Sequence, residues 1–230
     1  DQISRLMEGV RQVSNNIAHD LRGPLNRIRS GLEMSLTRTQ TPEQYRAVLE
    51  QTITEIDNLL QTFNALLTIA QAESGARRQD FTDIDLSGLA ADVAELYEPL
   101  AEEKDLSFHV ALAPGVTVPG NRHLLSQALA NLLDNAVKYT PDGGSIAVSL
   151  TAPPTGPELV VADTGPGVPP EHRELVLERF ARLESSRNTP GSGLGLSLVA
   201  AAAGLHQARL TLADNHPGLR VSLTFPAVRA

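Results

Sequence analysis

The histidine–aspartate pair His19-Asp20 is the best candidate in this chain for nucleophilic chemistry. A carboxylate beside an imidazole can hydrogen-bond one ring nitrogen, which fixes the tautomer and leaves the other nitrogen free to attack an electrophile. The apolar residues before the pair step by threes and fours, the spacing of a seam between packed helices, at Ile3, Leu6, Val10, Val13 and Ile17. At about 100° per helical residue, His19 lies on the side away from that seam. A lone histidine is more often an ordinary surface or core residue, so the interpretation depends on the rest of the chain.

Two asparagines and a lysine share one side of a predicted helix over residues 122–139. Asn131 and Asn135 are four residues apart, and Lys138 is three further on. Carboxamide oxygens are hard ligands suited to Mg²⁺, and a lysine can meet phosphate as a point charge. The pattern indicates a magnesium and phosphate site, although a single asparagine is as often plain polar surface. We interpret Asp134, between the two, as a solvated residue rather than a ligand.

Two glycine clusters suggest a nucleotide. Asp163 directly follows the apolar run 159–162 and precedes a turn with Gly165 and Gly167, which is a weak signal alone. The second cluster, with glycines at 191, 193 and 195, opens a predicted helix, where backbone N–H groups attract anions and missing side chains let phosphate approach. Such a cluster also occurs in dinucleotide folds, but no parallel βαβ unit surrounds this one, which argues against a Rossmann domain.

The segment between the glycine clusters is polar and carries Arg179, Arg182 and Arg187. Each arginine can neutralise triphosphate charge, although any single one is more often simply solvated. Because residues 184–190 are poor in apolar side chains and are followed by glycines, we expect this segment to be mobile until nucleotide orders it. The sequence therefore predicts a lid over a nucleotide site.

Taken in order, these segments resemble the motifs of the sensor histidine kinases of two-component systems. The phosphoacceptor segment around His19 comes first, and the asparagine box (131–139), first glycine box (163–167), phenylalanine box (178–183) and second glycine box (191–196) follow. The resemblance implies ATP as substrate, Mg²⁺ held by Asn131 and Asn135, and a phosphoryl group received by His19 with Asp20 as base or orienting group. It also implies that Asp163 accepts a hydrogen bond from the adenine amino group. The nucleotide-binding residues that it implies are Asn131, Asn135, Lys138, Tyr139, Asp163, Gly165, Gly167, Arg179, Phe180, Arg182, Gly191, Gly193, Leu194, Gly195 and Leu196.

The implied partner is the receiver domain of a response regulator, whose aspartate would take the phosphoryl group from His19. Four residues after the histidine stands Gly23, where the family usually has Thr or Asn, so the resemblance does not extend to phosphatase activity. The ATP-binding half alone would equally suit the wider superfamily of gyrase, the Hsp90 chaperones and mismatch-repair proteins. The helical segment with His19 decides against those relatives.

Three function classes stay open at this point: an autophosphorylating kinase, an interaction module in which nucleotide is only structural, and a phosphatase-biased regulator. The complete set of nucleotide boxes favours the first, and Gly23 disfavours the third. A phosphorylated His19 would distinguish the kinase from the interaction module.

The composition excludes some kinds of site and disfavours some binding partners. The 230 residues contain no cysteine, which excludes a disulfide framework or a thiolate metal site. The net charge of -8, without a dense basic run, disfavours nucleic acid. No apolar stretch approaches the roughly 20 residues of a membrane span. We expect the cytoplasmic portion of a longer inner-membrane sensor protein, which would meet the membrane only through a sensor portion upstream.

The N-terminal part is predicted to be a helical hairpin. A first helix spans about residues 3–37, and Thr41-Pro42-Glu43-Gln44 is typical of a capping box that starts a second helix. Ser74-Gly75 is predicted to end this second helix. Two long amphipathic helices cannot bury both apolar stripes alone, so we predict a homodimer with a four-helix bundle.

The rest of the chain predicts an α+β domain. Helices are expected at about 86–103, 122–139 and 195–204, and strands at 106–112, 145–150, 158–162, 208–213 and 219–225. Several successive strands lack a helical crossover, which favours a mixed sheet covered by helices on one face, an α/β sandwich. The predicted domains are therefore 1–75 for dimerisation and histidine phosphotransfer, 76–84 as a linker, and 85–230 for ATP binding and catalysis.

Overall fold

A computed structural model of the protein describes residues 25–26, 28–37, 41–54, 56, 81–178, 181, 183 and 193–227. The chain divides into two compact units, one of Asp1–Ala70 with Pro190–Ser192 and one of Gln71–Thr189 with Gly193–Ala230. Most of the predicted first helix, the end of the second and the first residues of the predicted linker lie outside the described residues. Among the described helices, none has both the length and the apolar character that crossing a bilayer requires.

Two helical stretches of the N-terminal unit are described, residues 28–37 and 42–54. The second stretch starts with a reciprocal cap. The backbone N–H of Thr41 donates to Oε1 of Gln44 (2.9 Å), and the N–H of Gln44 donates to Oγ1 of Thr41 (3.4 Å). With Pro42 at the first helical position, the predicted capping box is confirmed.

The apolar residues of the predicted seam from Ile3 to Ile17 lie outside the described residues, but large apolar side chains along the two described stretches are exposed in the single chain. Exposure is 81% for Leu36 and 59% for Ile53. The large apolar side chains exposed along these two stretches are Leu25, Leu32, Met34, Leu36, Tyr45, Leu49, Ile53 and Ile56. A monomer rarely leaves so many large apolar side chains in water, so these helices are suited to an association partner.

A five-stranded mixed sheet is the framework of the C-terminal unit, in the order β2-β4-β5-β7-β6. Strand β2 pairs in parallel with β4, and the other pairs are antiparallel. The bounds are β2 Ser107–Leu112, β4 Ser145–Thr151, β5 Glu158–Asp163, β6 Arg209–Asp214 and β7 Leu219–Thr224. The five predicted strands agree with these bounds to within one residue at each end.

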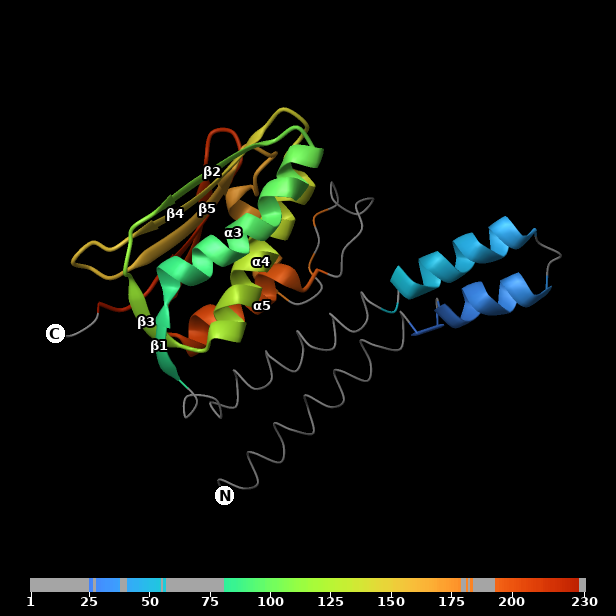
Figure 1. Ribbon diagram of the computed structural model, residues 1–230, viewed down its shortest axis with the longest axis horizontal. Coiled ribbons are helices and arrows are strands. Elements are labelled where there is room, and N and C mark those ends of the chain that lie inside the picture. The colour runs from blue at the N-terminus through green and yellow to red at the C-terminus, as the bar shows by residue number, and fades with distance from the viewer. Residues whose placement is uncertain are drawn as a thin grey trace, which may run out of the picture. The chain divides into compact units, whose positions relative to one another are not determined.

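Three helices cover one face of this sheet (Figure 1). They are α3 (Leu86–Glu103), α4 (Arg122–Tyr139) and α5 (Gly195–Leu205), and two short 3₁₀ turns, η2 (Pro170–His172) and η3 (Leu175–Leu177), precede α5. The side chain of Asp85 caps α3 by accepting from the N–H of Gly88 (2.9 Å), and that of Asn121 caps α4 through the N–H of Leu124 (3.1 Å). Since these caps are local in sequence, the predicted ranges 86–103 and 122–139 match the structure.

The core lies between the helices and the sheet. Ile146, Val148 and Leu150 alternate along β4 and are 0–1% exposed, because successive strand residues face opposite sides. Leu89 of α3 and Leu133 of α4 are fully buried in the same core. These contacts hold α4, which carries both candidate asparagines, against the sheet.

A second, two-stranded sheet corrects the sequence prediction. β1 (Thr82–Asp85) pairs antiparallel with β3 (Thr117–Gly120), and neither strand was predicted. The last three residues of the predicted linker, 82–84, are thus part of β1, with Ile84 only 7% exposed. Four-residue strands carry little local signal, and their pairing depends on chain segments more than thirty residues apart.

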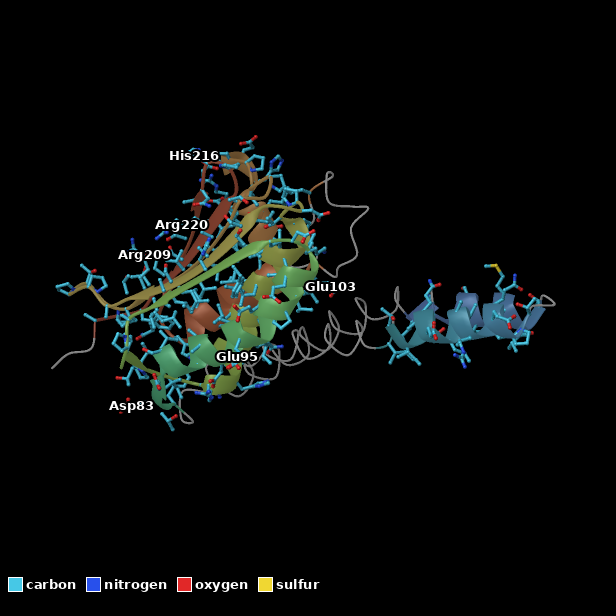
Figure 2. All side chains as sticks on the ribbon, turned by 45° about the horizontal axis from the view of Figure 1, so that its top comes forward. Asp83, Glu95, Glu103, Arg209, His216 and Arg220 are labelled. Carbon is cyan, nitrogen blue, oxygen red and sulfur yellow. The ribbon has the colours of Figure 1, made fainter. Side chains whose placement is uncertain are left out.

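The sheet face away from the helices carries polar and small side chains. Figure 2 shows Arg209 and Arg220 on this side and Glu95 and Glu103 on the side of α3. The guanidinium of Arg220 reaches along the sheet to the carboxylate of Glu158 (3.9 Å). Long charged side chains that lie flat on a sheet shield the small residues beneath from water.

Candidate nucleotide-binding site

The asparagines of α4 face the start of α5. A Cβ atom added to Gly195 would lie 3.2 Å from Oδ1 of Asn131 and 3.6 Å from Nδ2 of Asn135. Glycine at this position therefore lets the first turn of α5 approach both carboxamides closely. Two segments more than sixty residues apart, predicted separately as metal and phosphate sites, are brought together by the fold.

The carboxamide of Asn131 has a defined orientation. Its Nδ2 donates to the backbone carbonyl of Gln127 (2.7 Å), so Oδ1 remains as an acceptor on the side of Gly195. Oxygen is the donor atom that Mg²⁺ prefers, and Mg²⁺ usually takes only one or two protein ligands beside water and phosphate. Among the described residues no group of three or more acidic or histidine side chains could hold a metal, so a magnesium site here would depend on this sparse set.

Lys138 and Tyr139 end the same helix. The Lys138 ammonium lies over the ring of Tyr139, 4.7 Å from its centroid, which is a cation–π contact. Asp134, by contrast, accepts a hydrogen bond from the hydroxyl of Tyr97 on α3 (2.8 Å). Burial raises the pKa of Asp134, and the donation from Tyr97 and the charge of Lys138 oppose that shift.

Asp163 stands at the end of β5, 9% exposed. Its Oδ1 accepts from the N–H of Gly165 (2.8 Å) and from the N–H of Leu219 (3.2 Å). Burial raises the pKa of this carboxyl, and the two backbone donors oppose the rise. Within the part of the chain that the structure describes, only Oδ1 is engaged, which leaves Oδ2 as an acceptor for an exocyclic amine.

The first glycine cluster adjoins the end of α4. A Cβ at Gly165 would lie 2.9 Å from Oδ1 of Asp163 and 3.0 Å from the carbonyl oxygen of Tyr139. A Cβ at Gly167, whose φ is +70°, would lie 2.8 Å from the carbonyl oxygen of Gly218. Both glycines are needed because backbone passes where a side chain would be.

The turn between β6 and β7 supports Asp163 and was not predicted to take part in the site. Nδ2 of Asn215 donates to the backbone carbonyl of Asp163 (2.8 Å), and a Cβ at Gly218 would overlap that same carbonyl oxygen. The sequence Asn-His-Pro-Gly signals a turn between two strands, but nothing in it indicates contact with a residue 52 positions away.

The second glycine cluster is described in part. Gly193 has a φ of +73°, which glycine adopts without strain. Leu194 is 2% exposed, so its side chain belongs to the core and only its backbone can meet a ligand, whereas Leu196 is half-buried and packs against that core. Five predicted nucleotide or lid residues lie outside the described residues: Arg179, Phe180, Arg182, Arg187 and Gly191.

Comparison with known proteins identifies the family. Residues 10–75 match the His Kinase A (phospho-acceptor) domain, and residues 120–229 match the histidine kinase-, DNA gyrase B- and HSP90-like ATPase domain. A solved structure of the mycobacterial sensor histidine kinase MprB is 35% identical, with a TM-score of 0.57, and the match covers 65% of this chain and 100% of that one. This chain belongs to the sensor histidine kinases.

Two further relatives define how much of such a kinase is present. The sensor protein IrlS of Burkholderia pseudomallei is 31% identical over 220 residues, which are 94% of this chain and 47% of IrlS. Full-length ShkA, solved in complex with AMPPNP, is 28% identical with a TM-score of 0.69, over 96% of this chain and 47% of that one. This histidine kinase chain thus spans about half the length of the relatives it matches and corresponds to their catalytic core.

The predicted helical phosphoacceptor part followed by an α/β ATP-binding domain is therefore confirmed as the fold class. His19 and Asp20 lie inside the matched phosphoacceptor domain but outside the described residues. In this histidine kinase the described part of the candidate site includes Asn131, Asn135, Lys138, Tyr139, Asp163 and the glycines beside them.

Proposed function

We propose that this chain transfers the γ-phosphoryl group of ATP to His19 and then to an aspartate of a separate response regulator. The observation that carries the proposal is the approach of Gly195 to Asn131, because it joins the predicted metal ligand to the predicted phosphate loop. The match of residues 10–75 to a phosphoacceptor domain supports His19 as the acceptor. The complex of the related ShkA with AMPPNP, an ATP analogue, supports the choice of nucleotide.

Each described residue has a role that follows from its surroundings. Oδ2 of Asp163 accepts the hydrogen bond of the adenine amino group, since Oδ1 already accepts two backbone bonds. The backbone at the start of α5 and the ammonium of Lys138 meet the phosphates. Asn131 and Asn135 would hold Mg²⁺, which would neutralise charge on the triphosphate.

The transfer to His19 balances without a further reactant. The lone pair of the imidazole nitrogen that does not face Asp20 attacks the γ-phosphorus, the bond from that phosphorus to the bridging oxygen breaks, and ADP leaves. The N–H proton on the other imidazole nitrogen then passes to Asp20 or to water. Positioning and charge neutralisation supply most of the catalysis in phosphoryl transfer, so the protein needs no covalent assistance beyond the acceptor.

We propose a homodimer through the N-terminal unit. The exposed large apolar side chains between Leu25 and Ile56 supply apolar surface that a second copy would cover in a four-helix bundle. The domain limits that we propose are 1–75 for dimerisation and phosphotransfer and 82–230 for ATP binding, which moves the start of the second domain from residue 85 to the start of β1.

Incubation of the chain with γ-labelled ATP and Mg²⁺ tests the proposal. We expect acid-labile label on the wild type, none on His19→Gln, and none after chelation of the metal. His19→Gln should bind ATP as tightly as the wild type, whereas Asp163→Asn should bind ATP much more weakly and take up little label. ATP binding without label on the wild type would favour the interaction module and contradict the kinase.

A further inference from the structure

Lys104, at the end of α3, hydrogen-bonds to the end of the neighbouring helix α4. It is the first residue after α3 and is half-buried. Its Nζ donates to the backbone carbonyls of Val137 (2.8 Å), Lys138 (3.2 Å) and Thr140 (2.7 Å). An ammonium group has three N–H donors, so all three are used.

These acceptors are backbone groups of the kind that a helix end leaves without partners. The last carbonyls of an α-helix have no intrahelical donor, and a cation there also meets the negative end of the helix dipole. The carbonyl of Ala136 is satisfied separately, by the N–H and the hydroxyl of Thr140 (3.0 and 2.6 Å). Among the described carboxylates none pairs with Lys104, so its positive charge is directed at α4.

The turn that Lys104 holds is the turn that borders the nucleotide site. Lys104 binds the carbonyl of Lys138 itself, and Tyr139, which is joined to Lys138 by the cation–π contact, lies between the bound carbonyls of Lys138 and Thr140. The carbonyl of Tyr139 lies against Gly165 of the first glycine cluster. Thr140 is fully buried, so this turn cannot relax into water when its partner is lost.

We propose that Lys104 is a positioning residue for nucleotide binding, which fixes the last turn of α4 and so places Lys138 and the first glycine cluster. This inference rests on the proposed function, because it assumes that the site takes ATP. Lys104 contacts backbone oxygens and acts through them. Its neighbours in sequence gave no sign of this role, since a lysine after two glutamates is usually a solvated surface residue.

The test compares Lys104→Met, which keeps the aliphatic stem and removes the donors, with Asp85→Ala, which removes a single capping bond at the other end of α3. Both variants should lower the thermal unfolding midpoint of the full chain. Calorimetric titration with ATP and Mg²⁺ should show a Kd about tenfold higher for Lys104→Met, because the last turn of α4 would no longer be held in place; this corresponds to about 1.4 kcal/mol of binding free energy. The Kd of Asp85→Ala should stay within about twofold of the wild type.

Rescue by a conservative change separates positioning from simple support of the fold. Lys104→Arg, which keeps a cation with several donors, should recover most of the ATP affinity. If Lys104→Met does not fold, Lys104→Gln keeps two donors and should bind ATP with intermediate affinity.

Other outcomes overturn the inference. If Lys104→Met or Lys104→Gln binds ATP with wild-type affinity, Lys104 does not position the site. If Asp85→Ala loses as much ATP affinity as Lys104→Met, the affinity follows the stability of the fold alone. A wild-type chain that binds no ATP would overturn the proposed function itself. Failure of the proposed function is distinguished from failure of the positioning role, because the first is seen in the wild type and the second only in the variants.

Discussion

The side-chain amide of Asn215 donates a hydrogen bond of 2.8 Å to the backbone carbonyl of Asp163, across 52 residues of sequence. The same turn supplies the N–H of Leu219 to Oδ1 of that aspartate (3.2 Å). The β6–β7 turn therefore holds both the backbone and the carboxylate of the residue that we assign to the adenine amino group. We therefore expect the turn to orient Oδ2 of Asp163.

Asn215→Ala should weaken ATP binding more than it weakens the fold. A lost hydrogen bond of this kind is worth about 1 kcal/mol, which corresponds to roughly a fivefold increase in the Kd for ATP. Calorimetric titration of the full chain would measure it. Thr211→Ala, which removes a similar volume from an exposed position on β6, is the matched control and should leave the Kd unchanged. Equal affinities in the two variants would show that the turn does not orient Asp163.

Gly195→Ala should weaken the binding of ATP without lowering the stability of the fold. Alanine is a better helix residue than glycine by about 1 kcal/mol, but its Cβ would lie 3.2 Å from Oδ1 of Asn131, closer than an ordinary contact. We expect unchanged or higher stability with a clear loss of affinity for ATP and Mg²⁺. Gly204→Ala in the same helix has nothing within 4 Å of its Cβ and should raise stability without any change in affinity. Thermal unfolding and titration of both variants would reveal whether the approach of α5 to α4 matters.

ATP affinity should fall in acid because of Asp163. Burial raises the pKa of its carboxyl above the usual 3.8, so the acceptor for the adenine amine is present above that raised pKa and is lost as the pH falls through it. The raised pKa also means that protonating Asp163 favours the folded state, so this loss of affinity is not a consequence of unfolding. Titrations across pH 4.5 to 8 should show a Kd for ATP that depends on pH in the wild type. In Asp163→Asn the binding should be weak and its Kd should not change with pH. Parallel curves for the two proteins would exclude this role.

The stability of the C-terminal unit should depend on pH through His206. This histidine is 5% exposed, accepts from the N–H of Asn121 at Nε2 (3.0 Å), faces the carbonyl of Ala202 at Nδ1 (2.7 Å), and stacks on Phe81 at 4.8 Å between centroids. Burial lowers the pKa of His206, and the hydrogen bond to Ala202 opposes that shift. A lowered folded pKa contributes stability above the unfolded value of about 6.5, and that stability is lost as the pH falls through the folded value.

Denaturant unfolding between pH 7.5 and 5 measures this dependence. One proton contributes a slope of at most about 1.4 kcal/mol per pH unit. We expect the wild type to lose more unfolding free energy than His206→Gln over this interval, because glutamine does not titrate and its oxygen can accept from Asn121. An identical slope in the variant would assign the acid sensitivity to other groups.

Several elements could be predicted because their signals are local. The ranges of α3 and α4 follow from caps one turn away, and the strands β4, β5 and β7 follow from apolar runs bounded by turn residues. The candidate residues Asn131, Asn135 and Asp163 were found from residue type and spacing in the same way. The two short strands β1 and β3 were missed because each is defined mainly by the other, which lies far along the chain.

The sequence alone determined which chemical groups this kinase core carries and in what order, since the type of a residue and its spacing within a helix or turn do not depend on the rest of the chain. Only the tertiary structure decided that Gly195 meets Asn131, that Asn215 supports Asp163, and that Lys104 caps α4. These contacts join residues separated by 33 to 64 positions. Contacts at such separations are set by how helices pack on a sheet, and no periodicity within one element records them.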